Sequence, residues 1–274
     1  MKVFKMMLWL VMVVVGVVVA LSVYLYFNQK SMVFFPVKEL AVTPDDLNLS
    51  YEDVYLTVGG DKKIHGWFIP ADSSDSKVVL FCHGNGGNIS HRLETILFLR
   101  SLNTSILLFD YRGYGLSDGQ PSEDNVYGDV RACYDWLVDE REFQPGGIII
   151  FGRSLGGAVA IDLAAKVPCA GLVVESSFTS AKDMARKMFP FLPTSLIVRY
   201  KFDSIGKISS VAVPIVFIHS PQDEMIPFEM GEKLYERATG DKTFVRISGG
   251  HNDRDYMLTA QYRQAFENLL DSSH

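Results

Sequence analysis

The stretch Ile148–Ala165, IIIFGRSLGGAVAIDLAA, is the most informative part of this chain. Large apolar residues lead into the pentapeptide Gly152–Gly156, and small apolar residues typical of a buried helix follow it. The pentapeptide fits G-x-S-x-G, in which the serine occupies a sharp, strained turn between a strand and a helix. A β-carbon on either glycine would collide with a neighbouring strand or helix. The pattern predicts that Ser154 is a nucleophile at the carboxyl end of a parallel sheet; an ordinary turn with a serine N-cap is the alternative.

The rest of the chain alternates strand-like and helix-like segments. Strand patterns lie at Tyr51–Val58, Ile64–Pro70, Lys77–Cys82, Ser105–Asp110, Gly147–Phe151, Gly171–Glu175, Pro214–His219 and Lys242–Ile247. Helix patterns lie at Asn88–Leu102, Ser122–Asp139, Ser154–Ala165, Pro227–Ala238 and Asp253–Leu270. The central strands are continuous apolar runs, as is typical of strands buried on both faces. The alternation predicts an α/β fold with a mostly parallel eight-stranded sheet and helices on both faces.

An apolar segment precedes this domain. Met6–Phe27 holds 22 residues without a charge. As a helix it would rise about 33 Å, enough to cross a hydrocarbon layer of about 30 Å. A cleaved signal peptide is the alternative, but its apolar region is usually shorter, about 7–15 residues. We therefore expect an N-terminal transmembrane anchor over residues 1–30 and one catalytic domain over residues 31–274.

Charges and small residues around the apolar segment bear on its orientation and association. Lys2, Lys5 and the α-amino group precede it, and Lys30 and Lys38 follow it. The positive-inside rule then favours a cytoplasmic N-terminus and a catalytic domain on the exported side of a single-pass membrane protein. Gly16 and Ala20 form a small-xxx-small pair, which predicts a homodimer through this helix.

Composition excludes several classes of function. The net charge of −6 argues against nucleic acid as a partner. The three cysteines give no disulfide framework, and each lies in or beside an apolar run, which predicts buried thiols. Histidines and cysteines lack metal-ligand spacing, and the glycine-rich stretch Gly84–Ile89 misses the last glycine of G-x-G-x-x-G. We therefore expect neither a metal nor a cofactor.

One connection is too long for an ordinary loop. Residues 177–210 separate two predicted strands and are rich in apolar and basic side chains. We interpret this segment as an inserted cap over the site. Met188, Phe189 and Phe191 are its candidate substrate-binding residues, because flexible and aromatic side chains suit an acyl chain. Its basic residues suit an anionic bilayer surface.

A serine hydroxyl needs a base to take its proton. Of the six histidines, His251 alone follows the last strand in a glycine-flanked loop, VRISGGHND. The carboxylate that orients this imidazole should follow the preceding strand, where PIVFIHSPQDEMIP offers Asp223. Glu224 and Glu175 remain alternatives.

The negative oxygen of a tetrahedral intermediate needs hydrogen-bond donors. The backbone N–H of Leu155, next to the serine, is one candidate. The loop HGNGGN supplies the second: Asn85 is preferred and Gly84 is the alternative. The loop FDYRGYGLSDGQPSE is expected to give structural support through internal hydrogen bonds and ion pairs.

Several of these stretches together resemble a known family. HGNGGNISHR, DYRGYGLSDGQPSE, FGRSLGGAVA, ESSFTS and GGHND resemble the membrane-anchored α/β-hydrolases of the bud-emergence (Bem) group, which includes α/β-hydrolase-domain protein depalmitoylases. The resemblance covers roughly Tyr51 to the C-terminus. It implies an α/β-hydrolase fold in which Ser154, Asp223 and His251 form the triad. Residues 1–81 contain no cysteine, unlike relatives anchored through a palmitoylated, cysteine-rich N-terminus.

The leading hypothesis is a membrane-anchored serine carboxylic ester hydrolase that acts on lipid-like acyl esters through an acyl-enzyme. An acyl-protein thioesterase or a lysophospholipase would use the same residues on another leaving group. A membrane scaffold with a hydrolase fold is the non-enzyme alternative.

Overall fold

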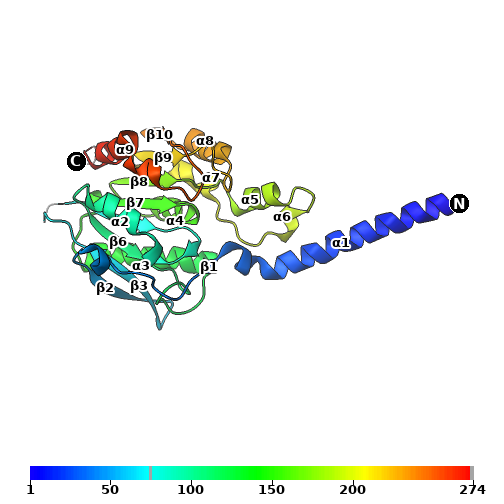
Figure 1. The fold of residues 1–274 in the computed structure, drawn as a ribbon, viewed down its shortest axis with the longest axis horizontal. Coiled ribbons are helices and arrows are strands. Elements are labelled where there is room, and N and C mark those ends of the chain that lie inside the picture. Colours follow the sequence, from blue (N-terminus) through cyan, green and yellow to red (C-terminus); the bar gives the residue numbers. More distant parts are fainter. Residues whose placement is uncertain (74–75, 272–274) are drawn as a thin grey trace.

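The strands follow the predicted order along the chain (Figure 1). They are β2 (Glu52–Val58), β3 (Lys62–Ile69), β4 (Val78–Cys82), β6 (Ser105–Phe109), β7 (Ile148–Arg153), β8 (Gly171–Glu175), β9 (Ile215–His219) and β10 (Lys242–Arg246). The computed structural model describes residues 1–73 and 76–271 and pairs these strands in the order β10-β9-β8-β7-β4-β6-β3-β2. Only the β2–β3 and β3–β6 pairs are antiparallel among these neighbours. The predicted mostly parallel sheet of eight strands is confirmed.

Helices cover both faces of the sheet. The helices α2 (Leu93–Arg100) and α9 (Ala260–Asp271) pack on one face, and α3 (Glu123–Asp139), α4 (Leu155–Ala164) and α8 (Phe228–Arg237) pack on the other. Alternate side chains of a strand supply the two cores. In β4, for example, Val79 and Phe81 belong to the first core, whereas Val78 and Leu80 belong to the second. Because both faces are buried, the central strands need no polar positions.

Two predicted helices are shorter than expected. The segment Asn88–Leu102 begins with a 3₁₀ turn, Ile89–His91, and Asp253–Leu270 begins with another, Asp255–Leu258. The side chain of Asn88 accepts a hydrogen bond from the Ser90 amide and thereby caps the first of these turns. Further 3₁₀ turns lie at Pro44–Leu47, Pro145–Gly147 and Ile208–Ser210.

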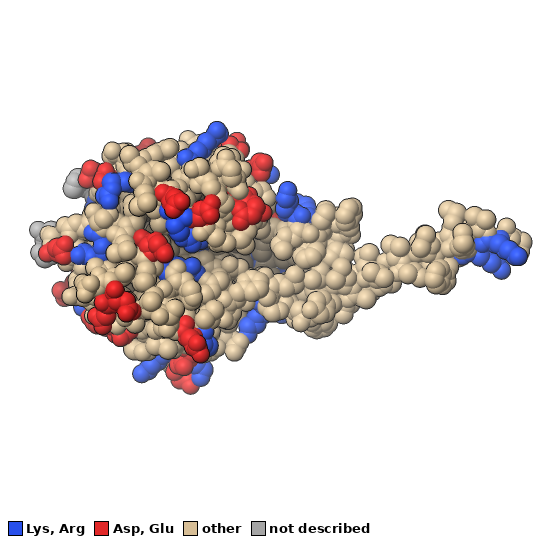
Figure 2. Space-filling view, viewed as in Figure 1, with Lys and Arg blue, Asp and Glu red and all other residues tan. Residues whose placement is uncertain are grey.

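The helix α1 (Lys2–Val33) projects away from the sheet (Figure 1). It is long and apolar enough to cross a membrane, and its most apolar window has no buried residue. Figure 2 shows the projection free of charge except for basic side chains at its tip. The helix continues past the expected boundary at residue 30, and Leu25 and Gln29 are its buried residues. Its last turns therefore belong to the folded domain.

The segment expected to form a cap consists of short helices between β8 and β9. These are α5 (Ala181–Met188), α6 (Thr194–Ile197) and α7 (Ser204–Lys207). Figure 1 shows α5 and α6 on the side of the domain from which α1 projects. A small second sheet ties the chain after α1 to the domain, because β1 (Phe35–Pro36) pairs in parallel with β5 (Gly86–Gly87).

The cysteines Cys82, Cys133 and Cys169 are buried free thiols, as predicted. Burial raises the pKa of the Cys169 thiol to about 12. All three thiols are therefore protonated and inert at neutral pH.

Candidate active site

Ser154 occupies a strained turn between β7 and α4. Its φ of 58° lies in the left-handed region, which a residue with a side chain rarely adopts. Three hydrogen bonds hold this backbone. The Ser154 amide donates to the carbonyl of Glu175 at 2.9 Å, and the Ser154 carbonyl accepts from the Ser177 hydroxyl at 2.8 Å and from the Gly157 amide at 3.0 Å. The neighbouring strand and helix thus fix where the Ser154 hydroxyl points.

The glycines on either side of Ser154 have no room for a side chain. A β-carbon at Gly152 would lie 2.2 Å from the Gly156 carbonyl oxygen, within α4. A β-carbon at Gly156 would lie 1.9 Å from the carbonyl oxygen of Cys82, at the end of β4. The predicted collisions with a helix and a strand are both present, and they explain why this turn needs both glycines.

His251 lies next to the Ser154 hydroxyl. Its Nε2 is 3.1 Å from the Ser154 Oγ, and its Nδ1 is 2.7 Å from the Oδ2 of Asp223. An ionised carboxylate can only accept, so Nδ1 carries the proton and Nε2 is left free to accept from the hydroxyl. The structure therefore brings Ser154, His251 and Asp223, which lie far apart in the sequence, into one hydrogen-bonded chain.

Asp223 is held as a carboxylate. Burial alone would raise its pKa, but hydrogen bonds from His219, His251 and the Ile226 amide outweigh burial and hold the pKa well below the usual range. The His219 Nε2 lies 3.3 Å from Asp223 Oδ2, and the Ile226 amide donates to Oδ1 at 2.8 Å. The alternative carboxylate Glu224 does not reach the imidazole ring; its Oε2 accepts from the His251 amide at 2.9 Å.

The other alternative, Glu175, has a different partner. It forms a buried ion pair with Arg153, with Nε and Oε1 2.9 Å apart, and accepts hydrogen bonds from the hydroxyls of Tyr256 and Tyr262 at 2.6 Å each. The Arg153 guanidinium also donates to the backbone carbonyl of His251. This network supports the histidine loop. Sequence reasoning missed it, although a charged residue between an apolar strand and Ser154 was a signal.

The two candidate donor residues for a negative oxygen lie at the same cavity. Leu155 begins α4, so its N–H is one of the first-turn amides that have no partner within a helix. Asn85 follows β4 and lines the cavity together with Ser154 and Leu155. The alternative Gly84 also lies next to the serine: a β-carbon there would lie 3.4 Å from that of Ser154.

The loop after β6 has the expected supporting role. The Tyr111 hydroxyl donates to the carbonyl of His83 at 2.9 Å, and the Tyr114 hydroxyl donates to the carbonyl of Asn85 at 2.8 Å. Arg112 pairs with the buried Asp129, with Nε and Oδ1 2.6 Å apart. These bonds brace the loop that carries Asn85.

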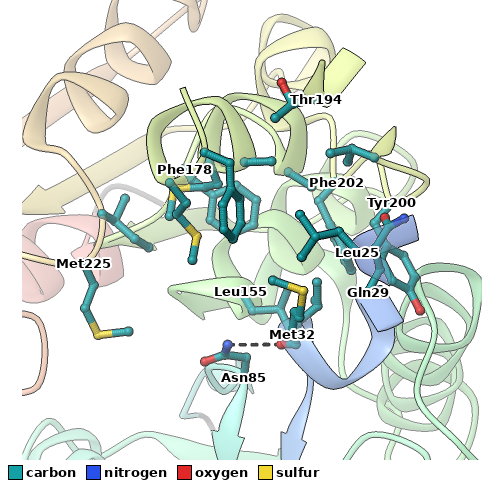
Figure 3. A pocket seen from close by; sticks show the side chains of 18 of the residues that line it. Leu25, Gln29, Met32, Asn85, Leu155, Phe178, Thr194, Tyr200, Phe202 and Met225 are labelled. Carbon is teal, nitrogen blue, oxygen red and sulfur yellow. Dashed lines mark hydrogen bonds between the residues drawn. The ribbon is translucent and has the colours of Figure 1, made fainter. Parts of the chain in front are cut away.

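A cavity of about 480 Å³ is lined by Ser154, His251 and residues of the short cap helices. Figure 3 shows part of this lining, with Asn85, Leu155 and Phe178 labelled. The cavity walls are mainly apolar, and a cavity of this size and composition is typical of a small-molecule site. Residues 177–210 supply one wall, which comprises Phe178, Ala181, Met184, Ala185, Met188, Phe189, Leu192, Thr194, Ile197, Val198, Tyr200 and Phe202.

Only some of the three candidate substrate-binding residues line this cavity. Met188 and Phe189 line it. Phe191 does not: its side chain is 92% exposed, and the neighbouring Leu192 takes the lining position instead. The chain turns after α5, so adjacent residues point in opposite directions. Sequence reasoning also missed the opposite wall, which α1 supplies.

Comparisons with known proteins show which family the chain belongs to. Residues 73–203 match the hydrolase family described as serine aminopeptidase, S33. The α/β-hydrolase domain-containing protein WAV2 of Arabidopsis thaliana is 34% identical over an alignment of 264 positions, and the match covers 87% of this chain and 86% of that protein. The chain belongs to the α/β-hydrolase family. An uncharacterized protein of Mycobacterium tuberculosis is similar to this α/β-hydrolase at 35% identity, over 85% of this chain and 84% of that one.

Solved structures support the fold of this α/β-hydrolase. The Pyrococcus furiosus esterase Pf2001 superposes with a TM-score of 0.72 at 24% identity, covering 86% of this chain and 98% of that one. A further relative, found by sequence, is the α/β-hydrolase domain-containing protein 17C of mouse, which is 33% identical over 77% of this chain and 64% of that protein.

Proposed function

We propose that this α/β-hydrolase is a serine hydrolase that cleaves carboxylic esters of long-chain acyl groups through an acyl-enzyme. The hydrogen-bonded chain from Ser154 through His251 to Asp223, at the floor of an apolar cavity, is the observation that carries the proposal. In this mechanism Ser154 is the nucleophile, His251 the general base and acid, and Asp223 the group that orients and stabilises the imidazolium.

The first half-reaction acylates the serine. His251 Nε2 takes the Ser154 hydroxyl proton as Oγ bonds to the acyl carbon. The backbone N–H groups of Leu155 and Asn85 stabilise the negative oxygen of the tetrahedral intermediate, an effect usually worth about 3–4 kcal/mol for each donor. The ester C–O bond then breaks, and His251 gives the proton to the leaving oxygen, which departs as an alcohol.

The second half-reaction releases the acid. His251 takes a proton from water as the water oxygen bonds to the acyl carbon. The bond between the acyl carbon and Ser154 Oγ breaks, and His251 returns the proton to Oγ. The carboxylic acid leaves and the free enzyme is restored. Burial of the three side chains excludes bulk water from the imidazole and keeps their geometry fixed.

We also propose that α1 anchors the enzyme in a membrane. Residues 6–24 of this helix carry no charge and lie outside the folded domain, which supports this proposal. The lysines at its tip favour a cytoplasmic N-terminus and a catalytic domain on the exported side. Carbonate extraction of membranes and protease protection of the intact domain test the anchor and its orientation.

Hydrolysis of p-nitrophenyl esters from acetyl to palmitoyl by the full-length protein in detergent tests the activity. The matched control is Ser154→Ala, which we expect to lower kcat by about 10³-fold or more. Labelling by a fluorophosphonate probe reports the nucleophile independently. A folded wild-type protein that neither hydrolyses any ester nor accepts the probe would contradict the proposal. Matched thioester and lysophospholipid substrates then decide which leaving group is preferred.

A further inference from the structure

The last turns of α1 line the cavity above Ser154. Leu25, Gln29, Met32 and Val33 all contribute to its wall, and their spacing of four, three and one residues puts them on one face of the helix. Figure 3 shows Leu25, Gln29 and Met32 around the same cavity as Leu155 and Asn85. The helix that we propose as the membrane anchor therefore also forms part of the substrate cavity.

Gln29 holds this wall against the cap. Its amide nitrogen donates to the carbonyl of Ile197 at 2.9 Å, and its amide oxygen accepts from the Arg199 amide at 2.7 Å. Gln29 is buried, and each of these bonds joins α1 to the cap across about 170 residues of sequence. A polar residue in an apolar helix is costly to bury unless it is fully bonded, and both ends of this amide have partners.

The end of α1 is also tied to the loop that carries Asn85. The Asn85 side-chain amide donates to the carbonyl of Val33 at 3.1 Å, and the Phe35 amide donates to the carbonyl of Asn85 at 3.0 Å. The position of the helix and the position of this candidate oxyanion loop are therefore coupled through short hydrogen bonds.

Apolar side chains surround this part of the molecule without being buried. Phe27 on α1, Met188 on α5, Phe191 after it and Leu196 on α6 are all at least 60% exposed. They lie where α5 and α6 approach the projecting part of α1 (Figure 1). Large apolar residues gathered beside a helix long enough to span a membrane fit contact with the acyl region of a bilayer.

We infer that the C-terminal turns of α1 form one wall of the acyl-binding site, and that the acyl chain of a membrane lipid ester reaches Ser154 from the bilayer, between α1 and the cap. This inference rests on the proposed function. It specifies the substrate as an ester whose long acyl chain is held in the same bilayer as the enzyme. It also makes α1 a specificity element in addition to an anchor.

Narrowing the cavity from the α1 side tests the wall. Leu25→Trp and its control Val23→Trp, at an exposed position that does not line the cavity, are compared as full-length proteins in phosphatidylcholine vesicles. We expect Leu25→Trp to lower the ratio of kcat/KM for p-nitrophenyl palmitate to that for p-nitrophenyl acetate by about tenfold or more, whereas Val23→Trp leaves the ratio unchanged. An equal effect of both substitutions on this ratio would overturn the inference.

A second measurement does not depend on activity. Met32→Cys and the control Val23→Cys are treated in detergent with a hexadecyl or a methyl fluorophosphonate and then with a maleimide. The native thiols are buried and stay unlabelled. We expect the hexadecyl probe alone to protect the thiol introduced at position 32, and neither probe to protect the one at position 23. Equal labelling at position 32 after both probes would overturn the inference.

The route from the bilayer is tested with vesicles. A long-chain ester is placed either in the vesicles that hold the enzyme or in separate ones added later. We expect hydrolysis chiefly of the ester that shares the enzyme's bilayer, and equal rates would overturn this route.

The mass of the treated protein shows whether a fluorophosphonate probe has attached to Ser154. This measurement separates a failure of the proposed function from a failure of the inference. If neither probe attaches, the proposed function fails and the inference fails with it; if both attach, a contrary result counts against the inference alone.

Discussion

The guanidinium of Arg153 donates a hydrogen bond to the backbone carbonyl of His251. The residue beside the candidate nucleophile thus holds the loop of the candidate base. Burial alone would lower the pKa of Arg153, but Glu175 and the tyrosines outweigh burial and raise it, so the charge persists at every accessible pH. Arg153 is a positioning residue, since it contacts His251 and does not line the cavity.

Removing this positioning residue should affect both stability and turnover. Arg153→Met leaves Glu175 buried without its cation, which should destabilise the fold by about 3–5 kcal/mol. In Arg153→Met/Glu175→Gln the unpaired charge is also gone, so we expect stability to recover while kcat stays low and KM changes little, because the His251 loop remains unheld. Chemical denaturation and steady-state kinetics measure the two effects.

The control for this prediction is Arg246→Met, which removes an exposed ion pair with Glu232. Such pairs contribute about 0–1 kcal/mol. Recovery of kcat together with stability in the double variant would show that Arg153 acts through stability alone.

Adding a single methyl group at Gly156, in the first turn of α4, should destabilise the fold. In Gly156→Ala the new β-carbon would overlap the Cys82 carbonyl oxygen, so β4 or α4 must move. We expect a loss of about 3 kcal/mol or more in the free energy of unfolding. At Gly146 nothing lies within 4 Å of an added β-carbon, and Gly146→Ala should cost less than about 0.5 kcal/mol. Thermal unfolding of the two variants in detergent would contradict the prediction if they were equally stable.

The contribution of Asp223 to the free energy of unfolding should decrease as the pH falls. Its pKa is depressed in the folded state, so the folded carboxyl binds fewer protons than the unfolded one as the pH approaches the ordinary value of about 3.9. The contribution is therefore fully present above that value and is lost as the pH falls below it. We expect the difference in stability between wild type and Asp223→Asn to shrink from about pH 5 to about pH 3. A difference that stays constant over this range would contradict the assigned cause.

Two neighbouring phenylalanines in the cap should differ in their effect on long-chain esters. Phe189 lines the cavity and Phe191 is exposed. Phe189→Ser should lower kcat/KM for palmitoyl esters in detergent by about tenfold relative to acetyl esters, since it replaces apolar lining by a hydroxyl. Phe191→Ser should not change this ratio. The measurement is kcat/KM of both variants for p-nitrophenyl esters of increasing acyl length. Equal effects of the two substitutions on the palmitoyl-to-acetyl ratio would mean that the cap rearranges around the substrate.

Sequence reasoning recovers the parts of the molecule whose signals are local. The central strands of the main sheet are buried on both faces and are continuous apolar runs, so the amino-acid pattern alone identifies them. The turn at Ser154 needs glycines on both sides for steric reasons, and these are visible as a motif. His251 and Asp223 can be assigned because parallel strands bring their carboxyl ends to one edge of the sheet.

Other features depend on packing between distant segments, which local patterns do not express. Residues 6–27 of α1 carry apolar side chains on all sides of the helix, so nothing in this pattern marks Leu25 as a position that lines the cavity. The bonds of Gln29 to the cap join residues 168 and 170 positions apart, and the exposure of Phe191 depends on how the chain turns after α5. The fold and the candidate triad residues can be predicted from local sequence, because burial and backbone strain act on neighbouring residues. The walls of the cavity follow only from tertiary packing, because those contacts form between segments that share no sequence pattern.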